Sequence, residues 1–310
     1  MTARGWLLFS LLGVVWGIPY LMIKVAVDEV SPSMVVFTRC ALGAALLLPF
    51  ALRQPGLART VRTRWKPMLA FACIEIIGPW WTLTDAERHL SSSTAGLLIA
   101  GVPIVGVALA RFFGAAEHLG ARRVTGLVLG LTGVAVLAAP HLTGGDARSL
   151  GEVMLTVLGY AIAPLIAARH LKDVPTLHLT APCLALAALV YAPAAAASWP
   201  ARTPSTEALI ALAALGVVCT AVAFVAFMEL IKEAGPTRAT VITYVNPAVA
   251  VAAGALFLDE ALTASIAVAF ALILAGSVLA TAAAGPRRPS RPVPWSTRQT
   301  SRADGRVESP

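Results

Sequence analysis

Ten long apolar stretches, separated by short polar segments, limit what this chain can fold into. A bilayer core of about 30 Å is crossed by roughly 20 apolar residues in a helix, and each stretch is near that length. The pattern therefore predicts an all-α membrane protein with ten transmembrane helices. The stretches are residues 5–24, 33–52, 67–84, 93–114, 122–140, 150–169, 176–198, 206–231, 237–258 and 262–284.

The composition excludes a soluble enzyme and a disordered chain. Of the 310 residues, 58% are apolar and only 13% are charged, whereas a soluble domain carries about 25% charged residues. Trp16, Gly17 and Pro19 interrupt the first apolar stretch, and nine more stretches follow. We therefore interpret it as a retained helix rather than a signal peptide.

The four cysteines lie inside apolar stretches and lack the close spacing of a zinc or redox site. We interpret them as small core residues. They are Cys40, Cys73, Cys183 and Cys219.

The distribution of basic residues predicts the orientation. With the N-terminus inside, 19 of the 24 lysines and arginines fall in inner segments, and only Arg88, Arg148 and Arg202 fall in outer loops. Cytoplasmic loops carry such an excess, so we expect a multi-pass protein of the cytoplasmic (inner) membrane with both termini in the cytoplasm. The net charge of +8 then marks those loops and does not indicate a nucleic-acid partner.

The basic C-terminal segment, residues 285–310, holds five prolines and six arginines. Such a composition cannot form a packed element, so we predict a disordered cytoplasmic tail. Contact with anionic lipid or a partner and a solvated topology anchor are both open interpretations.

The second half of the chain repeats the first. Residues 93–119 match residues 236–262, with Pro103 opposite Pro247, and Glu117 opposite Glu260. Each half holds five spans, an odd number, so the second copy must enter the membrane from the opposite side. Inverted repeats are the architecture of secondary transporters, in which one half rocks against the other around a midplane site.

The repeat also predicts the domain boundaries. A first five-helix repeat occupies residues 1–141, and a second occupies residues 150–284. Duplication without transport is the alternative to a transporter.

Four motifs resemble one family of membrane proteins. They are WGIPYLMIK at 16–24, SPSMVVFTRCALGAALLLP at 31–49, AEHLGARRVTGLVLGLTGVAVL at 116–137 and LDEALTASIAVAFALILAGSVL at 258–279. In order, duplication and spacing they resemble the EamA group of the drug/metabolite transporter superfamily, and the second repeat departs most at Tyr160 and Ala161. The resemblance implies ten helices in two five-helix repeats, and export or exchange of a small metabolite such as an amino acid, a sugar or a drug.

The matched prolines are candidates for the lining of a substrate path. Pro103 and Pro247 each lie about 15 Å into a span, near the bilayer midplane. A proline frees the carbonyl four residues earlier, which should face protein or a water-filled cavity. Tyr244 and Asn246 bring a phenol and an amide to the same depth, either to bind substrate or to bridge helices. A purely structural kink is the alternative for the prolines.

Ionisable residues within spans are the other candidates. Glu75 is the only acid deep in a span, where it can bind a substrate amine or a proton, or serve as a neutral acid bonded to another helix. Arg39 needs a partner, for which Glu75 is a candidate. Trp16, Tyr20 and Lys24 recur every four residues and form a face suited to a carboxylate or an aromatic ring.

Lys24 also has a structural interpretation, in which it snorkels to the interface or pairs with Asp28. Trp6, Trp80 and Trp81 lie near span ends, and we predict that they belong to the aromatic belts rather than to a binding site.

These observations predict a secondary transporter that exports a small metabolite by alternating access at a midplane cavity. No Walker loop is present, so this chain should not hydrolyse ATP, and we predict neither enzymatic activity nor a cofactor or metal. The expected partners are the substrate, the lipid bilayer and, as a candidate coupling ion, protons. The alternatives are an intramembrane enzyme, for which no nucleophile–base pair is evident, and a non-transporting scaffold.

Overall fold

The computed structural model shows a helical bundle. It describes residues 2–102, 104–106, 109, 121–143, 146–234 and 245–281, and these form helices joined by short loops, without strands.

Eight helical elements make up the described part of the first half. They are α1 (Ala3–Val15), α2 (Pro19–Val27), α3 (Pro32–Arg53), α4 (Leu57–Phe71), the π-helix η1 (Ala72–Ile77), α5 (Gly78–Ala86), α6 (Ser92–Ile99) and α8 (Ala121–Thr143). Seven make up that of the second half. They are α9 (Ala147–His170), α10 (Thr176–Ala197), α11 (Thr206–Gly216), the π-helix η2 (Val217–Val222), α12 (Ala223–Ala234), α14 (Asn246–Phe257) and α15 (Ala264–Thr281).

Six helices of the described chain are long and apolar enough to cross a membrane. They are Ala3–Val27, Pro32–Arg53, Leu57–Ala86, Ala147–His170, Thr176–Ala197 and Thr206–Phe227. Four shorter apolar helices overlap the remaining predicted stretches. They are Ser92–Gly106, Val124–Leu137, Asn246–Phe257 and Ala264–Gly276. Ten complete crossings therefore stay a prediction.

The first predicted span is not one regular helix. It is broken at residues 16–18 between α1 and α2, because Pro19 cannot donate a helical hydrogen bond and is tolerated only in the first turn of a new helix. Gly17 allows a close approach there, since a Cβ at this position would lie 2.4 Å from Cβ of Val249.

The third predicted span is longer than expected. Its helical segment extends from Leu57 to Ala86 and is kinked at Arg64, which has non-helical angles (φ −116°, ψ 15°). Polar residues lie within this helix, Glu75 in η1 and Thr82, Thr84 and Asp85 in α5.

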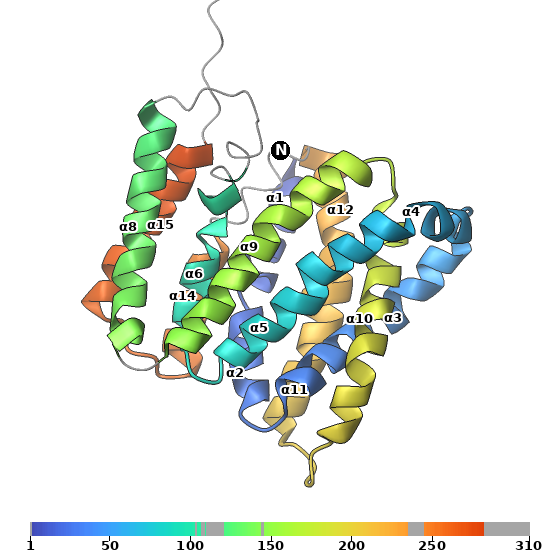
Figure 1. The fold of residues 1–310 in the computed structure, drawn as a ribbon, viewed down its shortest axis with the longest axis horizontal. Helices are drawn as coiled ribbons and strands as arrows, with labels where there is room; N and C mark the ends of the chain where they lie inside the picture. The colour runs from blue at the N-terminus through green and yellow to red at the C-terminus, as the bar shows by residue number, and fades with distance from the viewer. Residues whose placement is uncertain are drawn as a thin grey trace, which may run out of the picture.

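The helices form one bundle, with α8 and α15 paired at its side (Figure 1). These two helices come together at glycines, because a Cβ on Gly276 would lie 2.4 Å from the backbone nitrogen of Gly130. The loops at 28–31, 87–91, 198–205 and 258–263 gather at the lower end in Figure 1, which we call the Glu260 end. The N-terminal residues lie at the opposite end, the Arg4 end.

Three of the four cysteines are buried, but the expectation that all four are core residues is wrong. Cys40, Cys183 and Cys219 are buried, and Cys73 is exposed on η1. The one-residue shift of a π-helix changes which side chains point inward, so an apolar sequence context did not place Cys73 in the core.

Candidate functional site

A cavity of about 370 Å³ lies between the two halves of the chain. Helices from both halves contribute to it, including α2, α3 and α5 from the first and α9, α12 and α14 from the second. Six of the predicted site residues line this one space: Trp16, Tyr20, Arg39, Glu75, Asn246 and Pro247. Their roles in binding stay a prediction.

The other three predicted site residues are Pro103, Tyr244 and Lys24. Pro103 and Tyr244 lie outside the described residues. Lys24 points elsewhere, because its amino group donates a hydrogen bond to the main-chain oxygen of Glu87 at 2.7 Å. The alternative pairing of Lys24 with Asp28 is not among the ion pairs that the described residues form.

Arg39 links the two halves across the cavity. Its Nε donates to Oγ1 of Thr220 at 3.0 Å, and its guanidinium carbon lies 3.7 Å from the ring centroid of Trp80. The stacking uses one face of the guanidinium and the bond to Thr220 uses one of its five donors. The other donors can bind a carboxylate.

Glu75 lies on η1, and its Oε2 is buried without a hydrogen-bond partner. The expected ion pair between Glu75 and Arg39 is wrong: no such pair occurs within 4.0 Å among the described residues. Arg39 is held by Thr220 and Trp80 instead, so its guanidinium and the carboxyl group of Glu75 stand apart in one cavity.

Aromatic side chains form much of the apolar wall. Trp16 packs against Phe227 with ring centroids 4.9 Å apart and against Phe224 at 6.2 Å. The assignment of Trp80 to the aromatic belt is wrong, since it is buried and lines the cavity with Arg39 over its ring. Trp80 lies close to Arg39 because both face the bundle interior, which position near a span end did not reveal. Trp6, by contrast, is 56% exposed.

The two short helices α6 and α14 complete the wall. Ile99 lines the cavity at the end of α6, as Asn246 does at the start of α14. Pro247 lies in the first turn of α14, where a proline breaks no helical hydrogen bond. The helices pack closely, because a Cβ on Gly96 would lie 2.6 Å from Cβ of Ala250.

Sequence reasoning missed Glu87, which follows α5 directly. It lies in a predicted loop, yet it is 0% exposed, and neither carboxyl oxygen has a hydrogen-bond partner. The spacing of apolar residues could have indicated that Glu87 is buried. Leu83 lies four residues before Glu87 and Leu90 three residues after it, and both leucines are buried.

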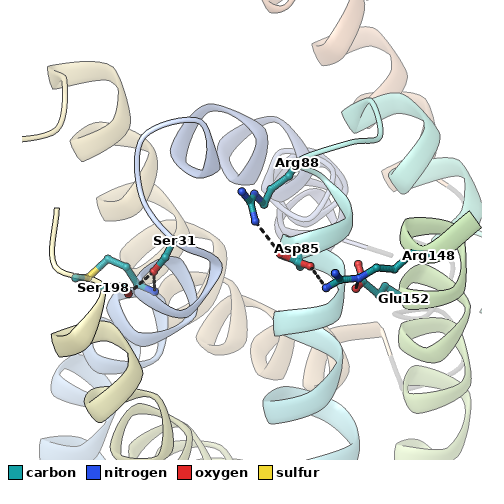
Figure 2. Close-up of polar contacts among 7 residues, drawn as sticks. Ser31, Asp85, Arg88, Arg148, Glu152 and Ser198 are labelled. Carbon is teal, nitrogen blue, oxygen red and sulfur yellow. Dashed lines mark hydrogen bonds and ion pairs between the residues drawn. The ribbon is translucent and has the colours of Figure 1, made fainter. Parts of the chain in front are cut away.

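Polar contacts join elements at the Glu260 end (Figure 2). The Asp85 carboxylate pairs with Arg148 at 2.9 Å and with Arg88 at 3.4 Å, and Arg148 also pairs with Glu152 at 2.8 Å. These contacts connect the end of α5 to the start of α9. Two of the three arginines that the sequence placed in outer loops are therefore neutralised by acids.

The loops between helices are joined at the same end. Ser31 and Ser198 share a hydrogen bond of 2.6 Å, and the Glu29 carboxylate accepts from the main-chain N–H of Ser205 at 2.6 Å and from its hydroxyl. Hydrogen bonds from Ser205 lower the pKa of the Glu29 carboxyl.

The described part of the chain has no evident metal-binding site. No group of three or more His, Cys, Asp or Glu side chains is placed there to hold a metal ion.

Comparison with known proteins agrees with this architecture. The chain matches the model of the EamA-like transporter family twice, at residues 3–139 and 150–282. A crystal structure of another protein, 22% identical, has the same fold, with a TM-score of 0.62 over 91% of this chain and 97% of that one.

Two curated relatives are membrane transporters by name. The uncharacterized inner membrane transporter YedA of Escherichia coli is 25% identical over 244 residues, 78% of each chain. A probable terminal-alkyne amino-acid exporter of Streptantibioticus cattleyicolor is 26% identical over 279 residues, 86% of this chain and 89% of the relative. With two family matches that together span most of its length, this chain is an integral, multi-pass membrane protein that belongs to the EamA-like transporter family.

Proposed function

We propose that the protein is a secondary transporter that exports a small zwitterionic metabolite, of the amino-acid class, by alternating access. The observation that carries the proposal is the separation of Arg39 and Glu75 within one cavity. Arg39 is held by Thr220 and Trp80, and Glu75 has a buried oxygen without a partner. A zwitterion satisfies both groups, because its carboxylate pairs with the guanidinium, and its ammonium favours the ionised form of the Glu75 carboxyl and pairs with it.

The remaining walls favour a substrate with an apolar or aromatic body. The rings of Trp16, Phe224 and Phe227 line one part of the cavity, and its volume of about 370 Å³ falls in the range of small-molecule sites, about 300–1,000 Å³. The similarity to the amino-acid exporter of Streptantibioticus cattleyicolor supports the same class of substrate and the outward direction.

The ten predicted spans and their inverted arrangement belong to the same proposal. The π-helices η1 and η2 support the repeat, since each is six residues long and they occur at matching places, Ala72–Ile77 and Val217–Val222. The distribution of basic residues supports a cytoplasmic Arg4 end and an outer Glu260 end. Single cysteines replacing Thr2 and Ala261 in a cysteine-free background should react with an impermeant reagent from opposite sides. Reaction of both from one side contradicts this topology.

Substrate class is tested by counterflow in proteoliposomes. Labelled phenylalanine and leucine should exchange with the unlabelled amino acid inside, whereas N-acetylphenylalanine, which lacks the ammonium, and phenethylamine, which lacks the carboxylate, should not compete. Asn246→Leu should reduce exchange more than the control Trp6→Leu, because the first removes a polar group from the cavity wall and the second removes only an interfacial anchor. Equal competition by the singly charged analogues contradicts zwitterion recognition, and export is tested by uptake into inverted vesicles.

A further inference from the structure

Glu87 is a buried acid that the proposed substrate site does not use. It lies between the third and fourth apolar helices, in the turn that joins α5 to α6. Its side chain is fully buried, and both carboxyl oxygens lack a hydrogen-bond partner. An unpaired carboxylate in such a place is so costly that the group takes up a proton instead.

The charged groups around Glu87 come from several elements. Lys24 on α2 donates to the main-chain oxygen of Glu87 at 2.7 Å, and Lys24, Glu260 and Arg39 all act on its carboxyl electrostatically. Asp85, two residues earlier, is occupied by Arg88 and Arg148. Tyr20 lines the cavity and interacts electrostatically with Glu87.

Glu260 is the acid in this group that joins the two halves of the chain at the same end. We call the arrangement that contains this contact the closed state. Its carboxylate accepts from the main-chain N–H groups of Ser92 at 2.7 Å and Ser93 at 3.0 Å, and from the Ser93 hydroxyl. It thereby caps α6 and satisfies donors that a helix leaves free at its N-terminus. Asp259, with a positive φ of 52°, turns the chain so that the second half of the protein supplies this cap to a helix of the first half.

The carboxyl groups of Glu87 and Glu260 interact electrostatically, and the interaction is repulsive when both are ionised. If both were ionised in the closed arrangement, their repulsion would oppose the cap on α6. A neutral Glu87 removes the repulsion and leaves Glu260 free to act as a carboxylate. The buried hydroxyl of Ser92, which also lacks a partner, shows that this region contains polar groups not yet satisfied in the closed state.

We propose that Glu87 is a proton-binding site that controls the opening of the Glu260 end, and that its proton exchanges with water only when that end opens. This inference rests on the proposed function for the alternation between closed and open states, but the proton site itself does not depend on the substrate. Opening the contact between Glu260 and α6 admits water to Glu87, whose carboxyl then releases its proton to water. Rebinding of a proton neutralises the group and restores the closed end.

The pH dependence follows from this difference between states. In the closed state burial raises the pKa of the Glu87 carboxyl well above its ordinary value, with Glu260 raising it further and Lys24 and Arg39 lowering it. The closed state therefore binds more protons than the open one, so raising the pH above the ordinary value of about 4.3 favours opening. One protonation site changes the ratio of the states by at most about tenfold per pH unit.

The site is tested by infrared titration of the full-length protein in nanodiscs. A protonated carboxyl band that shifts in heavy water should persist near neutral pH in the wild type and in Glu207→Gln, a control that removes an exposed acid from the same end. Glu87→Gln should lose that band, and Glu75→Gln should identify any second one. A spectrum unchanged by Glu87→Gln overturns the proposal.

The coupling is tested by the distance between spin labels at the Glu260 end. Cysteines replacing His89 and Ala261, both exposed, are labelled in a cysteine-free background, and the distance distribution is measured from about pH 5 to about pH 9. The wild type and Glu207→Gln should gain a wider population as the pH rises, whereas Glu87→Gln should keep the narrow one. Widening of Glu87→Gln along the wild-type curve, or no widening in the wild type, contradicts the coupling.

A further variant covers the case in which Glu87→Gln does not fold. Glu87→Asp keeps an ionisable group but shortens its reach, so the transition should remain with a shifted midpoint, and an unshifted midpoint counts against the site. In proteoliposomes, phenylalanine counterflow should rise with pH in the wild type, whereas counterflow by Glu87→Gln should stay low and change little with pH. Loss of exchange in the wild type contradicts the proposed substrate, and the infrared result still decides the proton site.

Discussion

The two π-helical segments occupy matching places but carry different chemistry. Each is six residues long and interrupts a long apolar helix, and Thr220 stands in η2 where Glu75 stands in η1. Oε2 of Glu75 has no hydrogen-bond partner. Thr220 donates to the carbonyl of Leu215 at 2.8 Å and accepts from Arg39.

The difference shows how a repeated backbone can serve two tasks. A π-turn places one extra residue in the helix and is frequent at functional sites. In η2 the polar side chain is used internally to hold a cation, and in η1 it is left available to a ligand. The comparison therefore predicts an anchoring role for Thr220 and a binding role for Glu75.

The largest expected effect comes from removing the charge that distinguishes η1. Glu75→Gln keeps the shape of the side chain but cannot ionise, so a substrate ammonium is left without its partner. Loss of one partner of a desolvated charge pair costs about 2–5 kcal/mol, which is roughly 30-fold or more in affinity. Counterflow of phenylalanine should fall by that amount while thermal stability in nanodiscs is kept. Wild-type exchange in this variant means that Glu75 has only a structural role.

A smaller effect is expected when the cation held by η2 is changed but not removed. Arg39→Lys keeps the charge but loses the planar group that stacks on Trp80 and the geometry of a two-point contact with a carboxylate. We expect the apparent affinity for phenylalanine to fall about tenfold, equivalent to about 1.4 kcal/mol. Competition assays with amino acids measure this, and an unchanged affinity rules out a two-point contact between Arg39 and a carboxylate.

A third variant tests the anchor itself. Thr220→Val keeps the shape of the side chain and removes both hydrogen bonds of its hydroxyl, each worth about 1 kcal/mol. The guanidinium of Arg39 then loses one of its two fixed points, so exchange should fall by a few-fold. Thr220→Ser restores the hydroxyl and should recover exchange. Failure of the serine variant to recover it shows that packing, rather than the hydroxyl, matters at this place.

Much of the fold follows from the sequence because the bilayer sets the length of its helices. The described helices overlap all ten predicted stretches, and the break at residues 16–18 occurs where Gly17 and Pro19 interrupt the apolar pattern. The π-helices could not be predicted, since the apolar run through Ala72–Ile77 has no feature that separates a π-turn from an ordinary helix.

The sequence predicted which residues line the cavity better than it predicted the contacts between them. We chose Arg39 and Glu75 from their predicted depth in the membrane. An ionisable group is costly there, so it is a candidate for a functional role. Depth alone could not tell that Arg39 is held by Thr220 and Trp80 instead of by Glu75. Glu87 was missed because a position just outside a span was taken to be in water, whereas the turn that holds it packs inside the bundle.

The smallest effect should come from the start of the helix that leads into η2. Glu29 is exposed and binds Ser205, the N-cap residue of α11, and the hydrogen bonds from Ser205 lower the pKa of the Glu29 carboxyl. A lowered pKa in the folded state means that the contact stabilises the protein above the ordinary acid value, about 4.3, and that this stabilisation is lost as the pH falls through the lower folded value. Glu29→Gln should therefore lower the Tm in nanodiscs by at most about 2 °C near neutral pH, and the difference from wild type should shrink in acid. Glu207→Gln, on the first turn of the same helix, is the matched control. If the two variants behave alike at every pH, Glu29 adds nothing to α11, and the anchoring of η2 depends on Thr220 and Arg39 alone.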